Sequence, residues 1–304
     1  MTLRIATRGS KLALWQAEHV RARLLDLQPG LTIELVILKT QGDKILDVAL
    51  AKVGGKGLFV KEIEDALLEN RADLAVHSMK DVPSELPEGL GLAAILERED
   101  PRDAFLSVKI ASLQDIPQGA TLGTSSLRRA AQILAWRSDI KIELLRGNVD
   151  TRLAKLDEGR YDAILLAAAG LKRLGFGHRI TSTLDLDCMV PAVGQGAVGV
   201  ECRLADSELV NLIRRLNHDD TSACVLVERE FNLAIGGSCQ IPAGCHARIA
   251  GGRFHLDAFI ASPNGSTLLR RSASGAVADL SGSGAKLAAE LLDAGGRHLL
   301  AQIL

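Results

Sequence analysis

Residues 120–137, ATLGTSSLRRAAQILAWR, indicate the fold class, because they contain a strand, a turn and a helix in immediate succession. Thr124 or Ser125 is expected to cap the helix, leaving free backbone N–H groups at its positively polarised start. Arg128 and Arg129 follow at once. The unit is therefore either a binding site for carboxylate or phosphate or an ordinary capped helix with solvated arginines.

The flanking sequence repeats this alternation on both sides of the unit. Strands that alternate with helices imply parallel sheets with helices on both faces, so most of the chain is predicted to be α/β. The expected strands lie at residues 3–8, 32–38, 72–78, 140–147 and 161–171, and the expected helices at 11–27, 57–72 and 148–160.

The pattern changes after about residue 218, where a small α+β domain is expected. A helix at 221–235 is followed by three strands within 246–274, and composition alone assigns 272–284 to a loop or linker. A helix at 284–304 closes the chain. The turns between the strands are expected at Gly251-Gly252 and Asn264-Gly265.

Length and composition limit the classes of function. The 304 residues are enough for about two or three domains. A net charge of -1 gives no global field for nucleic acid or a membrane surface, and 3% aromatic residues argue against a stacking surface for single strands. No window approaches a membrane span and the N-terminus has no apolar signal core, so a cytoplasmic protein is expected. Five irregularly spaced cysteines favour a reducing compartment.

Arginines are expected to gather where strands end. Arg146 ends one expected strand, Arg152 lies one to two turns into the next helix, and Arg173 lies just beyond the strand at 161–171. Ligands of open α/β sheets bind at the carboxyl ends of strands, and arginine binds carboxylates through two donors. Together with Arg128 and Arg129 these residues predict a carboxylate site, with chance surface placement as the alternative.

Two further motifs have the composition of an active site. In VHSMKDVP, Lys80 and Asp81 follow an apolar strand and form either a catalytic pair or an exposed turn pair. AKVGGKGLFVKE lacks the spacing and the Ser or Thr of a phosphate-binding P-loop. A flexible lid carrying Lys52 and Lys56 fits it better, and a simple glycine turn is the alternative.

The loop AIGGSCQIPAG, residues 234–244, places Cys239 among glycines. Cysteine is normally buried, whereas loops run over the surface, so the thiol is either used in the function or is a free structural cysteine. Cys239, Cys245 and His246 do not have the spacing of a zinc site, and no metal is expected.

These motifs resemble, in order and spacing, those of the porphobilinogen deaminase (hydroxymethylbilane synthase) family, from about residue 3 to the C-terminus. The motifs are RIATRGSKLALWQA, KVGGKGLFVKE, AVHSMKDVP, EREDPRDAF, GTSSLRR, LRGNVDTR, PAVGQGAVGVECR and GGSCQIP. The resemblance implies a transferase that joins four porphobilinogen molecules head to tail on a covalent dipyrromethane primer, releases ammonia, and then hydrolyses off the linear tetrapyrrole hydroxymethylbilane. A non-enzymatic carboxylate- or oxyanion-binding protein is the alternative.

The resemblance also implies roles for individual residues. Cys239 would carry the primer through a thioether, and Asp81 would be the catalytic carboxylate, kept ionised by Lys80. The family's loop usually has glycine before the cysteine, whereas this chain has Ser238. The remaining implied residues bind the cofactor (Lys80, Asp81, Ser126, Arg128, Arg129, Arg146 and Gly170), bind the substrate (Arg8, Ser10, Arg146, Arg152, Arg173 and Gln195), or form a lid (Lys52, Lys56 and Phe59).

The implied architecture is three domains, the first two resembling periplasmic binding proteins with the active site between them. Nothing in the sequence demands more than a monomer, and a monomer is expected. Because PAVGQGAVGVECR returns the chain to the first domain, that domain is discontinuous. The expected domains are residues 1–96 with 197–214, residues 102–190, and the α+β domain of residues 219–304.

Overall fold

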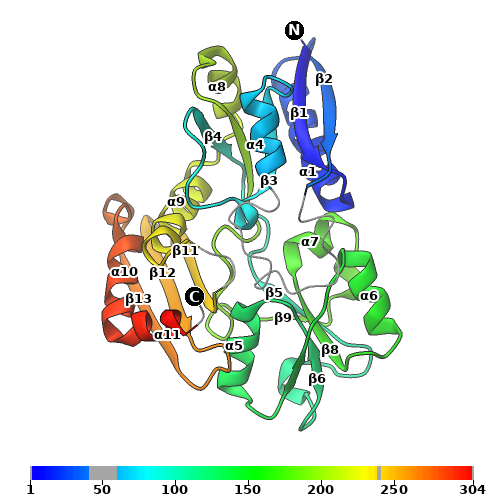
Figure 1. Cartoon of the computed structure of the whole chain (residues 1–304), viewed down its shortest axis with the longest axis vertical. Coiled ribbons are helices and arrows are strands. Elements are labelled where there is room, and N and C mark those ends of the chain that lie inside the picture. Colours follow the sequence, from blue (N-terminus) through cyan, green and yellow to red (C-terminus); the bar gives the residue numbers. More distant parts are fainter. Residues whose placement is uncertain (1, 41–59, 238–240, 303–304) are drawn as a thin grey trace.

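The computed structural model describes residues 2–40, 60–237 and 241–302. It contains two five-stranded sheets and one three-stranded sheet, and Figure 1 shows them as two α/β lobes with the smaller sheet beside them. This arrangement confirms the predicted fold class. No helix among the described residues is long and apolar enough to cross a membrane.

The first sheet has the order β2-β1-β3-β10-β4. Helices α1 and α8 cover one face, where Leu3, Val20 and Leu209 belong to one core, and α4 covers the other face with Ile63. The strands are β1 (Thr2–Arg8), β2 (Thr32–Leu38), β3 (Leu74–Ser78), β4 (Leu90–Ile95) and β10 (Val198–Arg203), and the helices are α1 (Lys11–Leu27), α4 (Lys61–Leu68) and α8 (Ser207–Arg214).

The second sheet has the order β7-β6-β8-β5-β9 and lies below the first in Figure 1. Its strands are β5 (Asp103–Leu106), β6 (Thr121–Gly123), β7 (Lys141–Glu143), β8 (Ala163–Ala167) and β9 (Ser182–Thr183), and its helices are α5 (Leu127–Trp136), α6 (Val149–Asp157) and α7 (Ala168–Arg173).

Both large sheets are mixed, so the prediction of parallel sheets is wrong in part. In the first sheet, β10 runs antiparallel to β3 and β4, and in the second, β5 runs antiparallel to β8 and β9. These two strands follow the segments that cross between the lobes. They therefore arrive without the helical crossover that a parallel neighbour requires.

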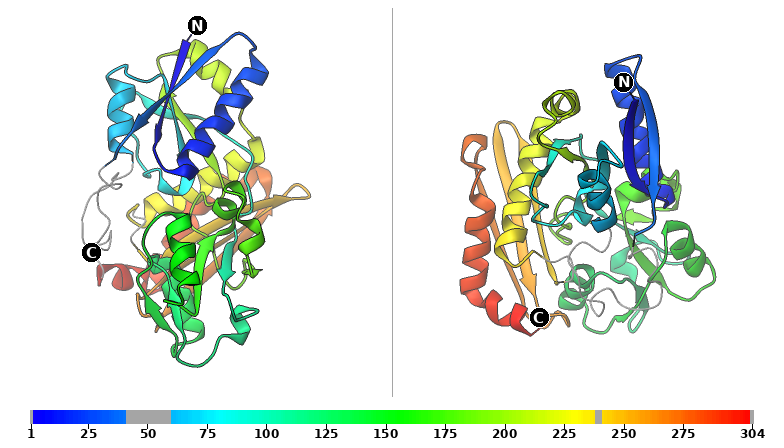
Figure 2. Two further views of the ribbon diagram at one scale, coloured as in Figure 1. Left: turned by 90° about the vertical axis from the view of Figure 1, so that its right-hand side faces the viewer. Right: turned by 45° about the horizontal axis from the view of Figure 1, so that its top comes forward.

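The three-stranded sheet is an antiparallel meander of β11 (Ala243–Ala250), β12 (Arg253–Ala261) and β13 (Leu268–Ala276). Gly251 and Gly252 have φ of +56° and +72°, as a two-residue hairpin turn requires. Helices α9 (Asp219–Ala234) and α10 (Ser283–Leu291) pack on one face of this sheet, and α5 of the second lobe contacts it through Ala131 (Figures 1 and 2).

Several predicted elements differ from the structure. The strand expected at 140–147 covers only Lys141–Glu143. The expected strand at 161–171 stops at Ala167 and continues as α7, because its alanine-rich second half favours a helix. Ser272–Ala276, assigned to a linker, pairs with β12. The closing helix is broken at Gly295, where φ is +116°, between α10 and α11 (Arg297–Ala301). The remaining short turns are 3₁₀ helices at Met79–Asp81, Leu113–Asp115, Gly177–Arg179 and Val277–Asp279, and a π-helical segment at Leu292–Gly296.

Candidate active site

Lys80 and Asp81 lie in the 3₁₀ turn that follows β3. The turn is held at its start, because the Gln16 side chain donates to Ser78 Oγ at 2.8 Å and Met79 N donates to the Ala197 carbonyl at 3.0 Å. Lys80 is half-buried, whereas Asp81 is exposed. The apolar strand therefore carries a cation and a carboxylate to the edge of the first sheet that faces the second lobe (Figure 1).

Helix α5 of the second lobe begins with a cap formed by Ser126. Its Oγ accepts from Arg129 N at 3.4 Å, and Thr124 Oγ1 accepts from Ser126 N at 3.2 Å. The prediction that Thr124 or Ser125 caps the helix is therefore wrong by one residue. Ser125 is exposed, and Thr124 supports the turn that brings Ser126 into the capping position.

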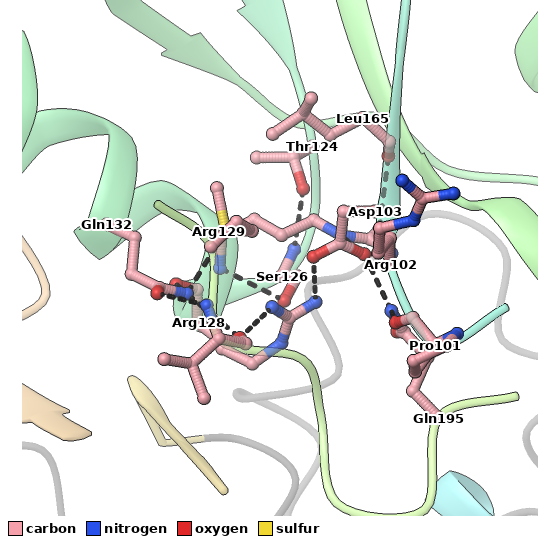
Figure 3. A network of polar contacts seen from close by, with 12 residues as sticks. Pro101, Arg102, Asp103, Thr124, Ser126, Arg128, Arg129, Gln132, Leu165 and Gln195 are labelled. Atoms are coloured by element: carbon pink, nitrogen blue, oxygen red, sulfur yellow. Dashed lines mark hydrogen bonds and ion pairs between the residues drawn. The ribbon is translucent and has the colours of Figure 1, made fainter. Parts of the chain in front are cut away.

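Arg128 and Arg129 do not extend into solvent from this helix. Both are buried and form ion pairs with the buried Asp103 (Figure 3). Arg128 lies 2.7 Å from Asp103 Oδ2, and Arg129 lies 2.7 Å from Asp103 Oδ1. Arg128 also donates to the Val190 carbonyl, and Gln195 Nε2 donates to Asp103 Oδ1 at 2.9 Å. The two guanidinium groups hold the pKa of Asp103 well below its usual range against the effect of burial.

Positive charge exceeds negative charge at the centre of this arrangement. The pKa of Lys80 is lowered to about 8, mainly by burial and in smaller part by Arg129 and Arg152, while Asp81 and Asp103 act in the opposite direction. Burial, Arg129 and Arg146 likewise lower the pKa of Arg152 to about 10. Such shifts mark cations that repel one another in a partly dehydrated place. We call Lys80, Arg129, Arg146 and Arg152 the cation cluster.

The loop between β7 and α6 supplies Arg146 to the cation cluster, and α6 itself supplies Arg152. Asn148 caps α6 by accepting from Thr151 N at 2.9 Å, and Arg152 Nε donates to the Gly147 carbonyl at 2.8 Å. Burial lowers the pKa of Arg146, which is half-buried in the same loop. Arg152 of the capped helix helps to lower the pKa of Lys80 in the other lobe, and Arg146 helps to lower that of Arg152, so Arg152 connects Arg146 with Lys80.

The other predicted binding residues have partners of their own. Arg8 ends β1, which is parallel to β3, so Arg8 shares the sheet edge of Lys80. Ser10 caps α1 by accepting from Ala13 N at 3.3 Å. Gly170 is buried in α7 against Leu12 of α1. Arg173, at the end of α7, donates to the Gly196 carbonyl at 2.7 Å and stacks on the ring of Trp15.

Four predicted residues lie outside the described part of the chain, namely Lys52, Lys56, Phe59 and Cys239. The described chain before Cys239 ends with Gly236 and Gly237, whose φ of +99° and +66° favour glycine. Gly237 lies beside Ser84, three residues beyond Asp81. A cavity of about 470 Å³ is lined by both glycines together with Lys61, Glu64 and Ser84, and by no member of the cation cluster.

The second cysteine of this region is buried. Cys245 lies in β11, and burial raises the pKa of its thiol well above the usual value. A buried, protonated thiol is inert, so Cys245 is a poor site for attaching a group. The described residues contain no group of three or more His, Cys, Asp or Glu side chains that could hold a metal ion.

Two family models match the chain and together cover most of it. The model described as "Porphobilinogen deaminase, dipyromethane cofactor binding domain" matches residues 3–211, and "Porphobilinogen deaminase, C-terminal domain" matches residues 222–293. The chain belongs to the porphobilinogen deaminase family. Porphobilinogen deaminases are transferases of tetrapyrrole biosynthesis with a dipyrromethane cofactor. The match confirms the predicted family and decides for the enzyme over the carboxylate-binding protein.

Several solved structures are similar to this chain at low sequence identity. One is a putative methionine-binding lipoprotein from Bacillus subtilis, at 12% identity over 71% of this chain and 90% of that chain, with a TM-score of 0.45. A nutrient-binding protein from Burkholderia cenocepacia bound to methionine has 15% identity, coverage of 69% and 89%, and a TM-score of 0.44. The periplasmic VFT2 domain of Bordetella pertussis BvgS has 15% identity over 71% of this chain and 86% of that chain, with a TM-score of 0.42.

Sequence reasoning about this porphobilinogen deaminase missed its central carboxylate. Asp103 stands within the quoted motif EREDPRDAF, at the start of the apolar strand DAFL. An acidic residue at the head of a buried strand was the available signal, since a buried carboxylate requires a cationic partner. The same motif contains Arg98, which forms a bidentate, buried pair with Glu228 at 2.7 and 2.8 Å.

Proposed function

We propose that the cation cluster and Asp81 form the site at which porphobilinogen is bound and joined to the growing chain. The observation that carries the proposal is the excess of half-buried positive charge shared by the two lobes, with Asp81 exposed beside it. Porphobilinogen carries an acetate and a propionate on its ring, so each unit added brings two more negative charges to this place. An anionic ligand removes the repulsion among Lys80, Arg129 and Arg152.

The residues present fit the dipyrromethane cofactor. Two linked rings carry four carboxylates, and the cluster offers cations from both lobes, of which Lys80 and Arg152 have pKa values lowered by burial and by neighbouring cations. Lys80, Ser126, Arg146 and Arg152 would hold the cofactor's carboxylates, and the cofactor would supply the pyrrole to which the next unit is joined. Arg128 and Arg129 contribute differently, because Asp103 already occupies part of their donors.

Asp81 is the proposed catalytic residue. Bond formation between two pyrrole rings places positive charge on pyrrole nitrogen, and a fixed carboxylate close to that nitrogen stabilises the charge. The turn anchored at Ser78 and Met79 fixes its position next to Lys80. Asp81 thus orients the rings and offsets the developing charge.

Cys239 is the proposed attachment residue, in the loop that follows Gly237. Two observations support this proposal. Gly237, which precedes the loop, lies next to Ser84, three residues after Asp81, and the alternative thiol of Cys245 is buried. We further propose that the protein acts as a cytoplasmic monomer, on the sequence grounds given above. The domain boundaries stated there remain a prediction.

The test combines intact-protein mass spectrometry with turnover of porphobilinogen. Wild-type protein should run at the mass of the chain plus two porphobilinogens less two ammonias, and Cys239→Ser should run at the bare chain mass and be inactive. Asp81→Asn should carry the primer but turn over at less than about one hundredth of the normal rate, because its size is kept and its charge is lost. Asp81→Glu should retain more activity. Wild-type turnover by Asp81→Asn would move the catalytic role to another residue.

A further inference from the structure

The segment that follows Asp81 is held by a single arginine of the third domain. Arg229 of α9 donates from Nη2 to the carbonyl of Pro83 at 2.7 Å and to that of Ser84 at 3.1 Å, and from Nη1 to the carbonyl of Val82 at 3.3 Å. Three consecutive carbonyls therefore converge on one guanidinium group. Charge-assisted hydrogen bonds of this kind are among the stronger ones in proteins.

A second contact from the same helix holds the same segment. Asn232 lies three residues after Arg229 on the same side of α9, and its Nδ2 donates to Ser84 Oγ at 2.9 Å. The Asn232 carbonyl accepts from Gly237 N at 2.7 Å, and Gly237 itself lies against Ser84. The end of α9, the loop towards Cys239 and the segment after Asp81 therefore meet at Ser84.

Arg229 uses its charge in an unusual way. Within the described part of the chain it forms no salt bridge, although it is half-buried and burial lowers its pKa. Its hydrogen bonds go to carbonyls, and Glu201 offsets only part of the cost of burial, since the two side chains form no salt bridge. Its planar guanidinium group instead fixes the orientation of three consecutive peptide groups, those of residues 82–84.

The turn that carries Lys80 and Asp81 is thus anchored at both ends by different parts of the molecule. Its start is bonded to Gln16 of α1 and to the Ala197 carbonyl, and its exit is bonded to Arg229 of α9. Because α9 leads directly to the loop of Cys239, the exit anchor also sets where that loop begins relative to Asp81.

We propose that Arg229, assisted by Asn232, is a positioning residue that holds the Asp81 turn in register with the cofactor-bearing loop. It acts through the backbone of residues 82–84 and touches neither substrate nor cofactor. This inference rests on the proposed roles of Asp81 and Cys239. It predicts that loss of Arg229 slows bond formation between rings while leaving the carboxylate-binding cations in place.

The experiment compares Arg229→Gln and Arg229→Lys with the matched control Arg248→Gln, an exposed arginine of β11 in the same domain. Each protein is measured for primer content by intact mass, for melting temperature, and for kcat and KM with porphobilinogen, with kcat expressed per primer-bearing chain. Arg229→Gln should carry primer and lose about 10- to 100-fold in kcat, as expected for a misplaced catalytic group, with KM changed by less than about 3-fold. Arg229→Lys should recover part of the loss, and Arg248→Gln should match the wild type.

Each remaining outcome decides the proposal. A folded Arg229→Gln protein with wild-type kcat per primer overturns it, and so does a loss that disappears when kcat is corrected for missing primer. If Arg229→Gln does not fold, Arg229→Lys and Asn232→Ala replace it, and unchanged kcat in both overturns the proposal. The proposed function fails separately, when wild type and Arg248→Gln themselves lack primer or turnover.

Discussion

Asp103 shows how a site of positive charge depends on one buried carboxylate. It faces two arginines and a glutamine, so the group of four carries one net positive charge inside the second lobe. The sequence identified Arg128 and Arg129 from their position after a strand, and they lie near the site. Their counter-ion was missed although its place at the head of an apolar strand indicated burial, because the arginines that it meets depend on the pairing of β5 with β8 and β9, which no local pattern reveals.

We predict that Asp103→Asn destabilises the protein strongly. The substitution keeps the shape but leaves two buried guanidinium groups without a charge partner, which costs about 3–5 kcal/mol when one partner of a buried pair is removed. Urea unfolding followed by circular dichroism measures the change. Asp26→Asn on the exposed side of α1 is the control and should lie within about 0.5 kcal/mol of wild type. A loss below about 1 kcal/mol for Asp103→Asn would show that the arginines find other partners.

At the scale of elements, amphipathic helices and isolated strands were predicted best. The expected ranges 11–27 and 32–38 are the observed bounds of α1 and β2, because each has its own periodicity and is ended by proline, glycine or a polar residue. The errors fall where tertiary contacts override composition. Ser272–Ala276 becomes strand only because β12 offers a partner, and the closing helix bends at Gly295 as the chain returns over the sheet.

The start of α5 allows a test at this scale. Ser126→Ala removes the capping oxygen from Arg129 N and should lower the free energy of unfolding by about 1 kcal/mol. Ser125→Ala is the matched control, since Ser125 is exposed and precedes the cap, and it should change stability by less than about 0.5 kcal/mol. Chemical denaturation of both variants measures these changes in the free energy of unfolding. A greater loss in Ser125→Ala would restore the cap expected from sequence.

At the scale of the whole molecule, Glu228 joins the three parts of the structure. It accepts both guanidinium donors of Arg98, which precedes the second lobe, and the N–H of Gly194 on the returning segment. It also accepts Ala247 N of β11 at 2.8 Å. These partners lie far apart in sequence, so the motifs that contain them indicated the family but not this junction. A carboxylate with donors from every part fixes the two lobes and the C-terminal sheet with its helices against one another.

The junction predicts a specific dependence of stability on pH. Burial alone would raise the pKa of Glu228, but Arg98 and His246 lower it to about 2, against an ordinary value of 4.5. A carboxyl group whose pKa is lowered by folding stabilises the folded state above its unfolded pKa, here by about 3 kcal/mol, and loses that contribution as pH falls from about 4.5 towards about 2. Glu228→Gln should therefore be less stable than wild type at pH 7, and the gap between the two should narrow in that acidic window.

Urea unfolding at pH 7, 5, 4 and 3 measures this gap. Glu290→Gln, an exposed substitution on α10 of the same domain, should follow the wild type at every pH. Asp103 titrates in the same acidic direction in all three proteins, so its contribution cancels in the comparison. If the difference in the free energy of unfolding between Glu228→Gln and wild type stays constant from pH 7 to pH 3, the charge of the Glu228 carboxylate does not stabilise the junction. The loss would then come from the altered shape of the side chain, and the three parts would be held together mainly by their apolar contacts.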